Sequence, residues 1–190
     1  MMIDLEPAAE RMARLLDDIG EDDFAAPTPC PDARLGDLID HVGSLSGAFT
    51  EVAHKRPGEA PPAPPDAANL GDDWQQKIEK RLATLVAAWR DPSAWEGMAQ
   101  VAGNELPAEV AGRVVLDELV VHGWDIAVAS GQPYEPTDAE IEVASAFVSS
   151  FDAPRDGNLF GPVVPVPDDA PALDRLLGLT GRDPKWQPEQ

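Results

Sequence analysis

Residues 107–131 read PAEVAGRVVLDELVVHGWDIAVASG, and they are the part of the chain that says most about its architecture. Its apolar residues recur three and four positions apart, which is the spacing of an α-helix, and they leave little wettable surface. Pro107 suits the first turn of a helix, and Gly131 suits the position just past its end. We therefore predict a long helix here that is the most buried element of the protein.

The same periodicity predicts helices on both sides of this stretch. They cover residues 5–19, 35–54, 74–89 and 137–151, and a short helix follows in the proline-limited tail. Asp32 is a plausible N-cap for the second helix, and Thr137 with Glu140 forms a capping-box pattern for the fifth. A less regular stretch joins the third and fourth helices. With no clear strand alternation, the sequence predicts an all-α bundle that forms one domain over residues 1–190.

The charge of the chain excludes several classes of partner. Among 190 residues, 35 are acidic and 14 are basic, so the formal net charge is −21. A polyanion would be repelled at every approach, and no basic patch offsets this. We therefore expect no nucleic-acid partner and no binding to an anionic membrane surface.

Cysteine usage and the N-terminus bear on the compartment. Cys30 is the only cysteine, so an intrachain disulfide is excluded, and so is a cysteine-rich metal cluster. The N-terminal residues are interrupted by Asp4 and Glu6, and no window approaches the roughly 18 apolar residues of a membrane-spanning helix. These features predict a cytoplasmic protein.

Two of the three histidines lie on predicted core helices. His41 follows Leu38 by three positions and precedes Leu45 by four, so it shares the apolar face of its helix and should point into the bundle. Glu118 and His122 are four residues apart, which stacks a carboxylate and an imidazole on one helix face. His54 ends its helix beside two basic residues and is expected to be solvated.

Together, His41, Glu118 and His122 favour a divalent metal site. A carboxylate inside so apolar a helix is costly unless a cation or good hydrogen-bond partners meet it. Two imidazoles and one carboxylate are a recurrent catalytic set for zinc that leaves a fourth position for water or substrate. The simpler interpretation is that Glu118 and His122 form an ordinary helical pair. The inward position of His41 on a different helix makes a metal site a comparable alternative.

Three further residues have interpretations that the sequence leaves open. Asp125 lies three residues after His122 and could orient a ligand imidazole, or it could make an ordinary hydrogen bond to a neighbouring helix. Cys30 is expected to be a small buried apolar residue. Trp74 and Trp124 are expected in the core or at the rim of a pocket. Phosphate-binding, dinucleotide-binding and serine-hydrolase motifs are absent from the sequence.

Three motifs in order carry a family resemblance. The stretches TPCPDARLGDLIDHV, DELVVHGWDIA and APALDRLLGLTGRDPKW resemble the metal-binding branch of the DinB-like superfamily. More closely, they resemble the metal-binding domain of mycothiol-dependent maleylpyruvate isomerases and their single-domain relatives. The resemblance implies an up-down-down-up four-helix bundle with additional short C-terminal helices. It also implies a divalent ion, usually taken as zinc, with His41, Glu118 and His122 at the positions of the family's ligands.

The resemblance leads to three functional hypotheses. The first is a metal-dependent transferase or isomerase that binds a low-molecular-weight thiol, with mycothiol as cosubstrate, and directs the sulfur to an electrophile. The second is a metal-assisted hydrolase in which Asp125 or the surroundings of Glu118 help with proton transfer. The third is a non-enzymatic metal-binding module, for which a fourth protein ligand would be expected. Whether the chain forms a homodimer is left open.

Overall fold

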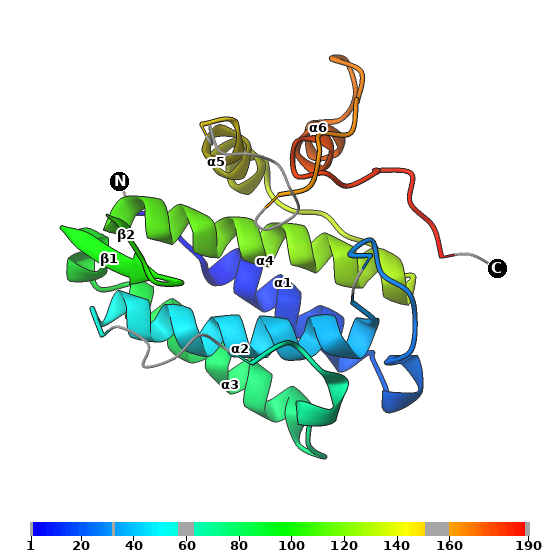
Figure 1. The fold of residues 1–190 in the computed structure, drawn as a ribbon, viewed down its shortest axis with the longest axis horizontal. Coiled ribbons are helices and arrows are strands. Elements are labelled where there is room, and N and C mark those ends of the chain that lie inside the picture. Colours follow the sequence, from blue (N-terminus) through cyan, green and yellow to red (C-terminus); the bar gives the residue numbers. More distant parts are fainter. Residues whose placement is uncertain (1, 32, 57–62, 151–159, 189–190) are drawn as a thin grey trace.

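The structure is a computed structural model that describes residues 2–31, 33–56, 63–150 and 160–188. Four helices form its core: α1 (Glu6–Asp17), α2 (Leu35–Ala53), α3 (Trp74–Trp89) and α4 (Ala108–Ser130). Helices α1 and α2 each pack against both α3 and α4, so α1 and α2 occupy opposite corners of the bundle. Figure 1 shows that α1 and α4 run in one direction while α2 and α3 run in the other, which confirms the up-down-down-up arrangement.

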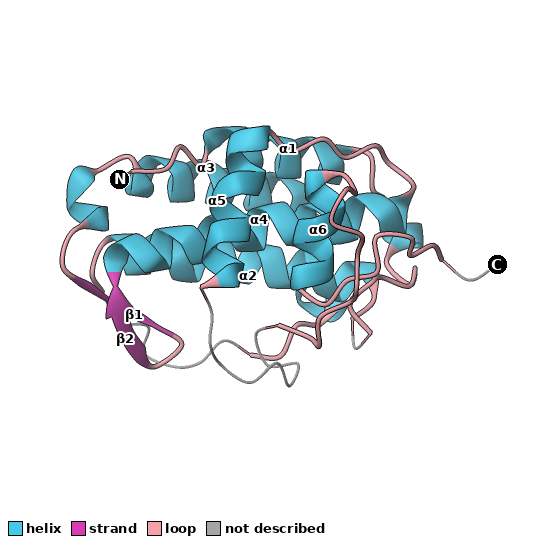
Figure 2. Cartoon of the chain, turned by 90° about the horizontal axis from the view of Figure 1, so that it is seen from above, coloured by secondary structure: helices cyan, strands magenta, loops and turns pink. Residues whose placement is uncertain are grey.

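Two shorter helices form an outer layer on one side of the bundle. Helix α5 (Asp138–Ser149) packs on α4, and α6 (Ala172–Leu179) packs on α5. Figure 2 looks down on this layer and places it over α4. Helix α4 is therefore covered on both sides, which explains why its sequence is apolar nearly all round. Its residues Leu116, Val120 and Ile126 are all fully buried.

Local signals set the ends of several helices as predicted. Gly131 follows α4 with a φ of 70°, a left-handed conformation that glycine adopts without steric cost. At the start of α5, Thr137 accepts a hydrogen bond from the backbone N–H of Glu140, and the Glu140 carboxylate accepts one from the Thr137 N–H. The N-cap of α2 is Arg34 rather than Asp32, which lies outside the described residues, and Asp37 accepts the Arg34 N–H. The predicted end of the fifth helix, near residue 151, also lies outside the described residues.

The stretch between α3 and α4 contains a β-hairpin that the sequence analysis did not predict. Strand β1 (Met98–Val101) pairs antiparallel with β2 (Asn104–Pro107). The two turn residues, Ala102 and Gly103, have φ values of 49° and 80°, as a tight two-residue hairpin turn requires. The hairpin lies at the end of the bundle opposite to the C-terminus (Figures 1 and 2). The protein remains overwhelmingly helical, so the predicted fold class holds.

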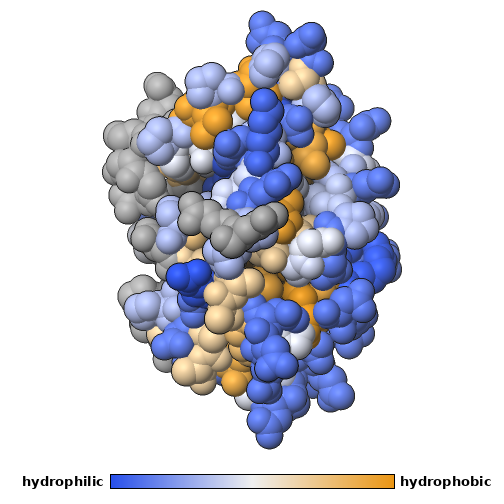
Figure 3. Space-filling view, turned by 90° about the vertical axis from the view of Figure 1, so that its right-hand side faces the viewer, coloured by the Kyte–Doolittle hydropathy of each residue, from blue (hydrophilic) through white to orange (hydrophobic). Residues whose placement is uncertain are grey.

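The surface agrees with the acidic composition. Hydrophilic side chains cover most of the face that lies at the right in Figure 1, and apolar side chains form smaller groups among them (Figure 3). Among the described residues, no helix combines the length and the apolar character needed to cross a bilayer.

Candidate metal centre

The structure brings His41, Glu118 and His122 together. His41 comes from the middle of α2, and the other two residues lie one turn apart on α4. The Nε2 atom of His122 is 3.0 Å from Glu118 Oε2, and the Nε2 atom of His41 is 4.0 Å from the same oxygen. The two imidazole rings stand nearly perpendicular, with centroids 5.1 Å apart. All three residues can offer one ligand atom within 4.8 Å of the others.

These separations fit a single small cation. Zinc bonds of about 2.0–2.1 Å at tetrahedral angles place ligand atoms roughly 3.3 Å apart. The observed separations of 3.0 and 4.0 Å lie on both sides of that value, so modest side-chain movements would bring the three ligand atoms into position around one ion. The side chains of His41, Glu118 and His122 are 33%, 20% and 12% exposed, so the site is half-buried and can be reached from outside. No other His, Cys, Asp or Glu among the described residues joins these three as a fourth ligand.

The three residues line a cavity of about 650 Å³. One wall comes from the connector before α2, which includes Pro29, Cys30 and Pro31. Another part of the wall comes from the tail, at residues 160–162 and 180–182. The volume is within the usual range for a small-molecule site. The cavity therefore offers room for a ligand beside the three candidate metal ligands.

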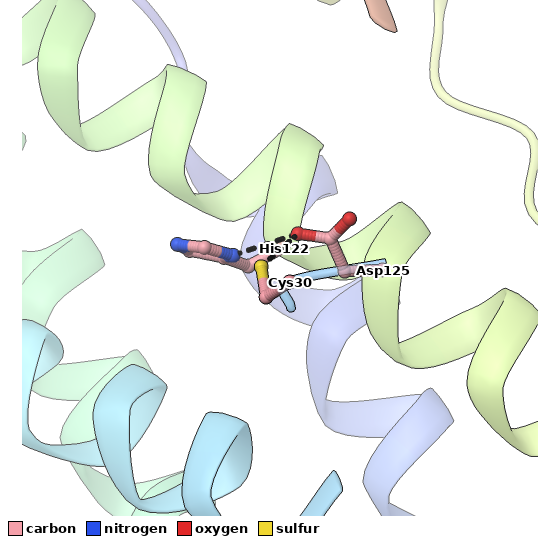
Figure 4. A group of neighbouring side chains, drawn as sticks. All are labelled: Cys30, His122 and Asp125. Atoms are coloured by element: carbon pink, nitrogen blue, oxygen red, sulfur yellow. Dashed lines mark hydrogen bonds and ion pairs between the residues drawn. The ribbon is translucent and has the colours of Figure 1, made fainter. Parts of the chain in front are cut away.

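The second nitrogen of His122 is held by Asp125. The Nδ1 atom of His122 lies 3.0 Å from Asp125 Oδ2, and the side chain of Asp125 is fully buried. Figure 4 shows the other ring nitrogen of His122 pointing away from Asp125. This nitrogen, Nε2, is the one that lies 3.0 Å from Glu118 Oε2. A hydrogen bond at Nδ1 fixes the tautomer and leaves Nε2 free to bind a metal. The predicted orienting role of Asp125 thus has the geometry it needs.

Cys30 and Arg182 complete the surroundings of Asp125. The Cys30 thiol donates to Asp125 Oδ2 at 3.2 Å (Figure 4). Arg182 donates to the same oxygen at 3.0 Å and to the Cys30 sulfur at 3.4 Å. Cys30 is therefore more than the small apolar residue that we expected. Although Cys30, His122 and Asp125 are also close enough to share an ion, the guanidinium of Arg182 already supplies the positive charge there.

These contacts shift the ionisation of the histidines in opposite directions. Burial lowers the pKa of His41, and repulsion from His122 lowers it further. Burial also disfavours the charged form of His122, but hydrogen bonds to Asp125, Cys30 and Glu118 outweigh this and raise the pKa of His122 well above its usual value. In the same way, His122 lowers the pKa of Glu118 although burial opposes it. Glu118 therefore carries the negative charge that a cation would meet.

Asp117 is a second carboxyl group on the cavity wall. Its side chain is 6% exposed, and its Oδ1 atom has no hydrogen-bond partner among the described residues. Burial, followed by repulsion from Glu118, raises the pKa of Asp117 to about 8. A buried polar atom without a partner is costly and uncommon in native structures.

The remaining sequence predictions can now be located. His54 is exposed just after the end of α2, as expected. Trp74 and Trp124 are both buried in the core. The sequence analysis did not single out Asp117 or Arg182. The only available signals were a second acid inside a very apolar helix and an arginine directly after Gly181 in the tail.

The four-helix core and its cavity place this chain among the DinB-like helical-bundle proteins. Within that class, the sequence model of the mycothiol maleylpyruvate isomerase N-terminal domain matches residues 5–127. The chain belongs to this family. The matched region contains His41, Glu118, His122 and Asp125, whereas Arg182 lies beyond it.

Full-length relatives of similar size occur in Mycobacterium tuberculosis. Uncharacterized proteins from two strains of this organism are each 28% identical to the chain over 183 residues. The alignment covers 92% of this chain and 93% of each relative. The likeness therefore extends beyond residues 5–127 and includes α5.

Two solved structures share the fold. They are crystal structures of the mycothiol-dependent maleylpyruvate isomerase and of a histidine-to-alanine mutant of it. Each superposes with a TM-score of 0.59 at 20% sequence identity and covers 76% of this chain. The match spans 65% of the length of the isomerase structures. At this identity the comparison establishes the fold.

Proposed function

We propose that the protein binds a divalent metal ion through His41, Glu118 and His122 and uses it to bind a small thiol. Zinc is the metal that we propose. The observation that carries this proposal is the convergence of the three ligand atoms in a cavity large enough for a ligand. Membership of the mycothiol maleylpyruvate isomerase N-terminal domain family supports the thiol. When bound, such an ion favours the thiolate form of a coordinated thiol at neutral pH.

The residues of the chain have separate tasks in this proposal. His41, with its lowered pKa, offers a neutral imidazole, and Glu118 offers a negative charge. Asp125 accepts a hydrogen bond from the Nδ1–H of His122 and so keeps Nε2 turned toward Glu118. Arg182 balances the charge of Asp125, and the tail that carries it forms one wall of the cavity.

The reaction that we propose is transfer of the thiol to an electrophile, or an isomerisation that passes through such an adduct. Mycothiol is the proposed thiol because a protein of the same fold is a mycothiol-dependent maleylpyruvate isomerase. Because Cys30 is a free thiol and mycothiol chemistry needs reducing conditions, we also propose a cytoplasmic location. A structural metal site is disfavoured, since such sites usually have four protein ligands and only three converge here among the described residues.

The test is thiol conjugation with and without metal. Zinc-loaded protein should accelerate the reaction of mycothiol with monochlorobimane, removal of zinc with dipicolinate should abolish the acceleration, and added zinc should restore it. His41→Ala should be inactive, and His54→Ala is the matched control because His54 is an exposed histidine just past the same helix. Equal activity of the metal-free protein would contradict the proposal. Hydrolysis of ester or amide substrates without added thiol would favour a metal-assisted hydrolase instead.

A further inference from the structure

Three carboxyl groups line the cavity, and two of them have partners within the protein. Asp37 accepts the backbone N–H groups of Arg34 and Ala67, so it is engaged in holding the start of α2. Glu118 is paired with His122. Asp117 differs from the other two, because its Oδ1 atom makes no hydrogen bond to the described residues. The residue is nevertheless buried, with an exposed fraction of 6%.

The position of Asp117 suits contact with a ligand. Asp117 precedes Glu118 in α4, so its Cα atom lies about 3.8 Å from that of a candidate metal ligand. Val121 lies one turn further along α4 and lines the same cavity, so the next cavity-lining side chain on that side of the helix is apolar. A group attached to a metal-bound sulfur by a few atoms would therefore lie within reach of the Asp117 carboxyl.

The charges around the cavity restrict the chemistry of that group. A carboxylate on the ligand would be repelled by Glu118 and Asp37, which line the same space. An ammonium group would be repelled by a divalent ion at the histidines. A neutral hydroxyl or amide carries a hydrogen-bond donor without either penalty, and it replaces the missing partner of a buried acceptor.

We infer that Asp117 is a specificity-determining residue that hydrogen-bonds a neutral hydroxyl or amide group on the thiol ligand. This inference rests on the proposed function, because it assumes that the sulfur of the ligand lies at the metal. It gives a role to a buried carboxyl oxygen that has no hydrogen-bond partner among the described residues. The selected ligands are hydroxylated or amide-bearing thiols, and purely apolar thiols are disfavoured.

The experiment compares two thiols with rings of the same size. The full-length protein is loaded with cobalt(II), and thiol binding is followed by the sulfur-to-cobalt charge-transfer absorbance. The probes are thioglucose, which carries hydroxyl groups, and cyclohexanethiol, which carries none. Wild-type protein should bind thioglucose at least about tenfold more tightly than cyclohexanethiol, because cyclohexanethiol leaves the buried carboxyl group without a partner.

Asp117→Leu should abolish this preference. The variant should lose about tenfold in thioglucose affinity, keep its affinity for cyclohexanethiol, and retain one cobalt per chain. Its melting temperature should be unchanged or higher, because an unpaired buried carboxyl is replaced by an apolar side chain. Asp117→Ala is measured beside it, so that a folding defect of the leucine variant does not decide the result. Asp117→Asn, which keeps a polar group of the same shape, should retain part of the preference.

Two outcomes overturn the inference in distinguishable ways. If both thiols give the charge-transfer band and the Asp117 variants bind them as wild type does, Asp117 does not contact the ligand and the proposed function stands. If neither thiol gives the band in wild-type protein while cobalt is bound, the metal does not bind thiols. In that case the proposed function fails, and the inference fails with it.

Discussion

The ion pair between Arg182 and Asp125 should be a main support of the fold and of the candidate metal centre. Arg182→Met keeps most of the side-chain volume and removes the charge. At the observed N–O distance of 3.0 Å, the Coulomb attraction is about 5–6 kcal/mol for an effective dielectric constant of about 20. Desolvation of the two groups offsets part of this, but Asp125 stays fully buried when its partner is removed.

The expected loss in free energy of unfolding is therefore about 3–5 kcal/mol, the usual cost of leaving one charge of a buried pair alone. Chemical denaturation of the zinc-loaded protein, followed by circular dichroism, measures it. Arg175→Met is the matched control, because Arg175 is exposed and donates to the backbone carbonyls of Asp168 and Ala170, so its loss should cost less than about 1 kcal/mol. A loss of under 1 kcal/mol for Arg182→Met as well would refute the assignment of Arg182 as the counter-charge of Asp125.

Two further predictions concern pH. Because the pKa of His122 is raised well above its usual value, metal binding near neutral pH must displace a proton, so metal affinity should increase with pH. Calorimetric titration in buffers of different ionisation enthalpy should show release of about one proton, and a binding heat independent of the buffer would contradict this. In metal-free protein, Asp117 has a folded-state pKa of about 8, far above the value of about 3.9 in an unfolded chain. Its contribution to stability is present below about pH 4 and is lost as the pH rises toward 8, by at most about 1.4 kcal/mol per pH unit. Asp117→Asn should remove this fall, and parallel stability curves for variant and wild type would show that Asp117 titrates normally.

Much of the fold follows from local patterns in the sequence. The helical spacing of apolar residues located α1 to α5 to within a few positions, and Trp74–Trp89 was predicted with the observed bounds. Gly131 and Thr137 mark helix ends through their own backbone conformation and side-chain bonds, so the sequence reveals them directly. The hairpin was missed because its strands are only four residues long and their pattern does not alternate clearly.

The candidate site could be predicted only in part, for a physical reason. His41, Glu118 and His122 lie on two regular helices, so helical periodicity alone indicates that they face the same interior. Arg182 reaches Asp125 from the tail, 57 residues away along the chain, and that contact depends on how α5 and α6 pack on α4. Asp117 could not be recognised from the sequence either. What distinguishes it is that its Oδ1 atom has no hydrogen-bond partner among the described residues, and only the packed structure shows this. The single-domain prediction for residues 1–190 stays a prediction.

The proposed function depends on His41, Glu118 and His122 holding one divalent metal ion together. Elemental analysis of the purified protein and of His41→Ala, both after exposure to zinc and removal of unbound metal, tests this most directly. We expect about one zinc per chain for wild type and little or none for the variant, with both proteins folded by circular dichroism. Full zinc content in His41→Ala, or no zinc in wild type, would contradict it.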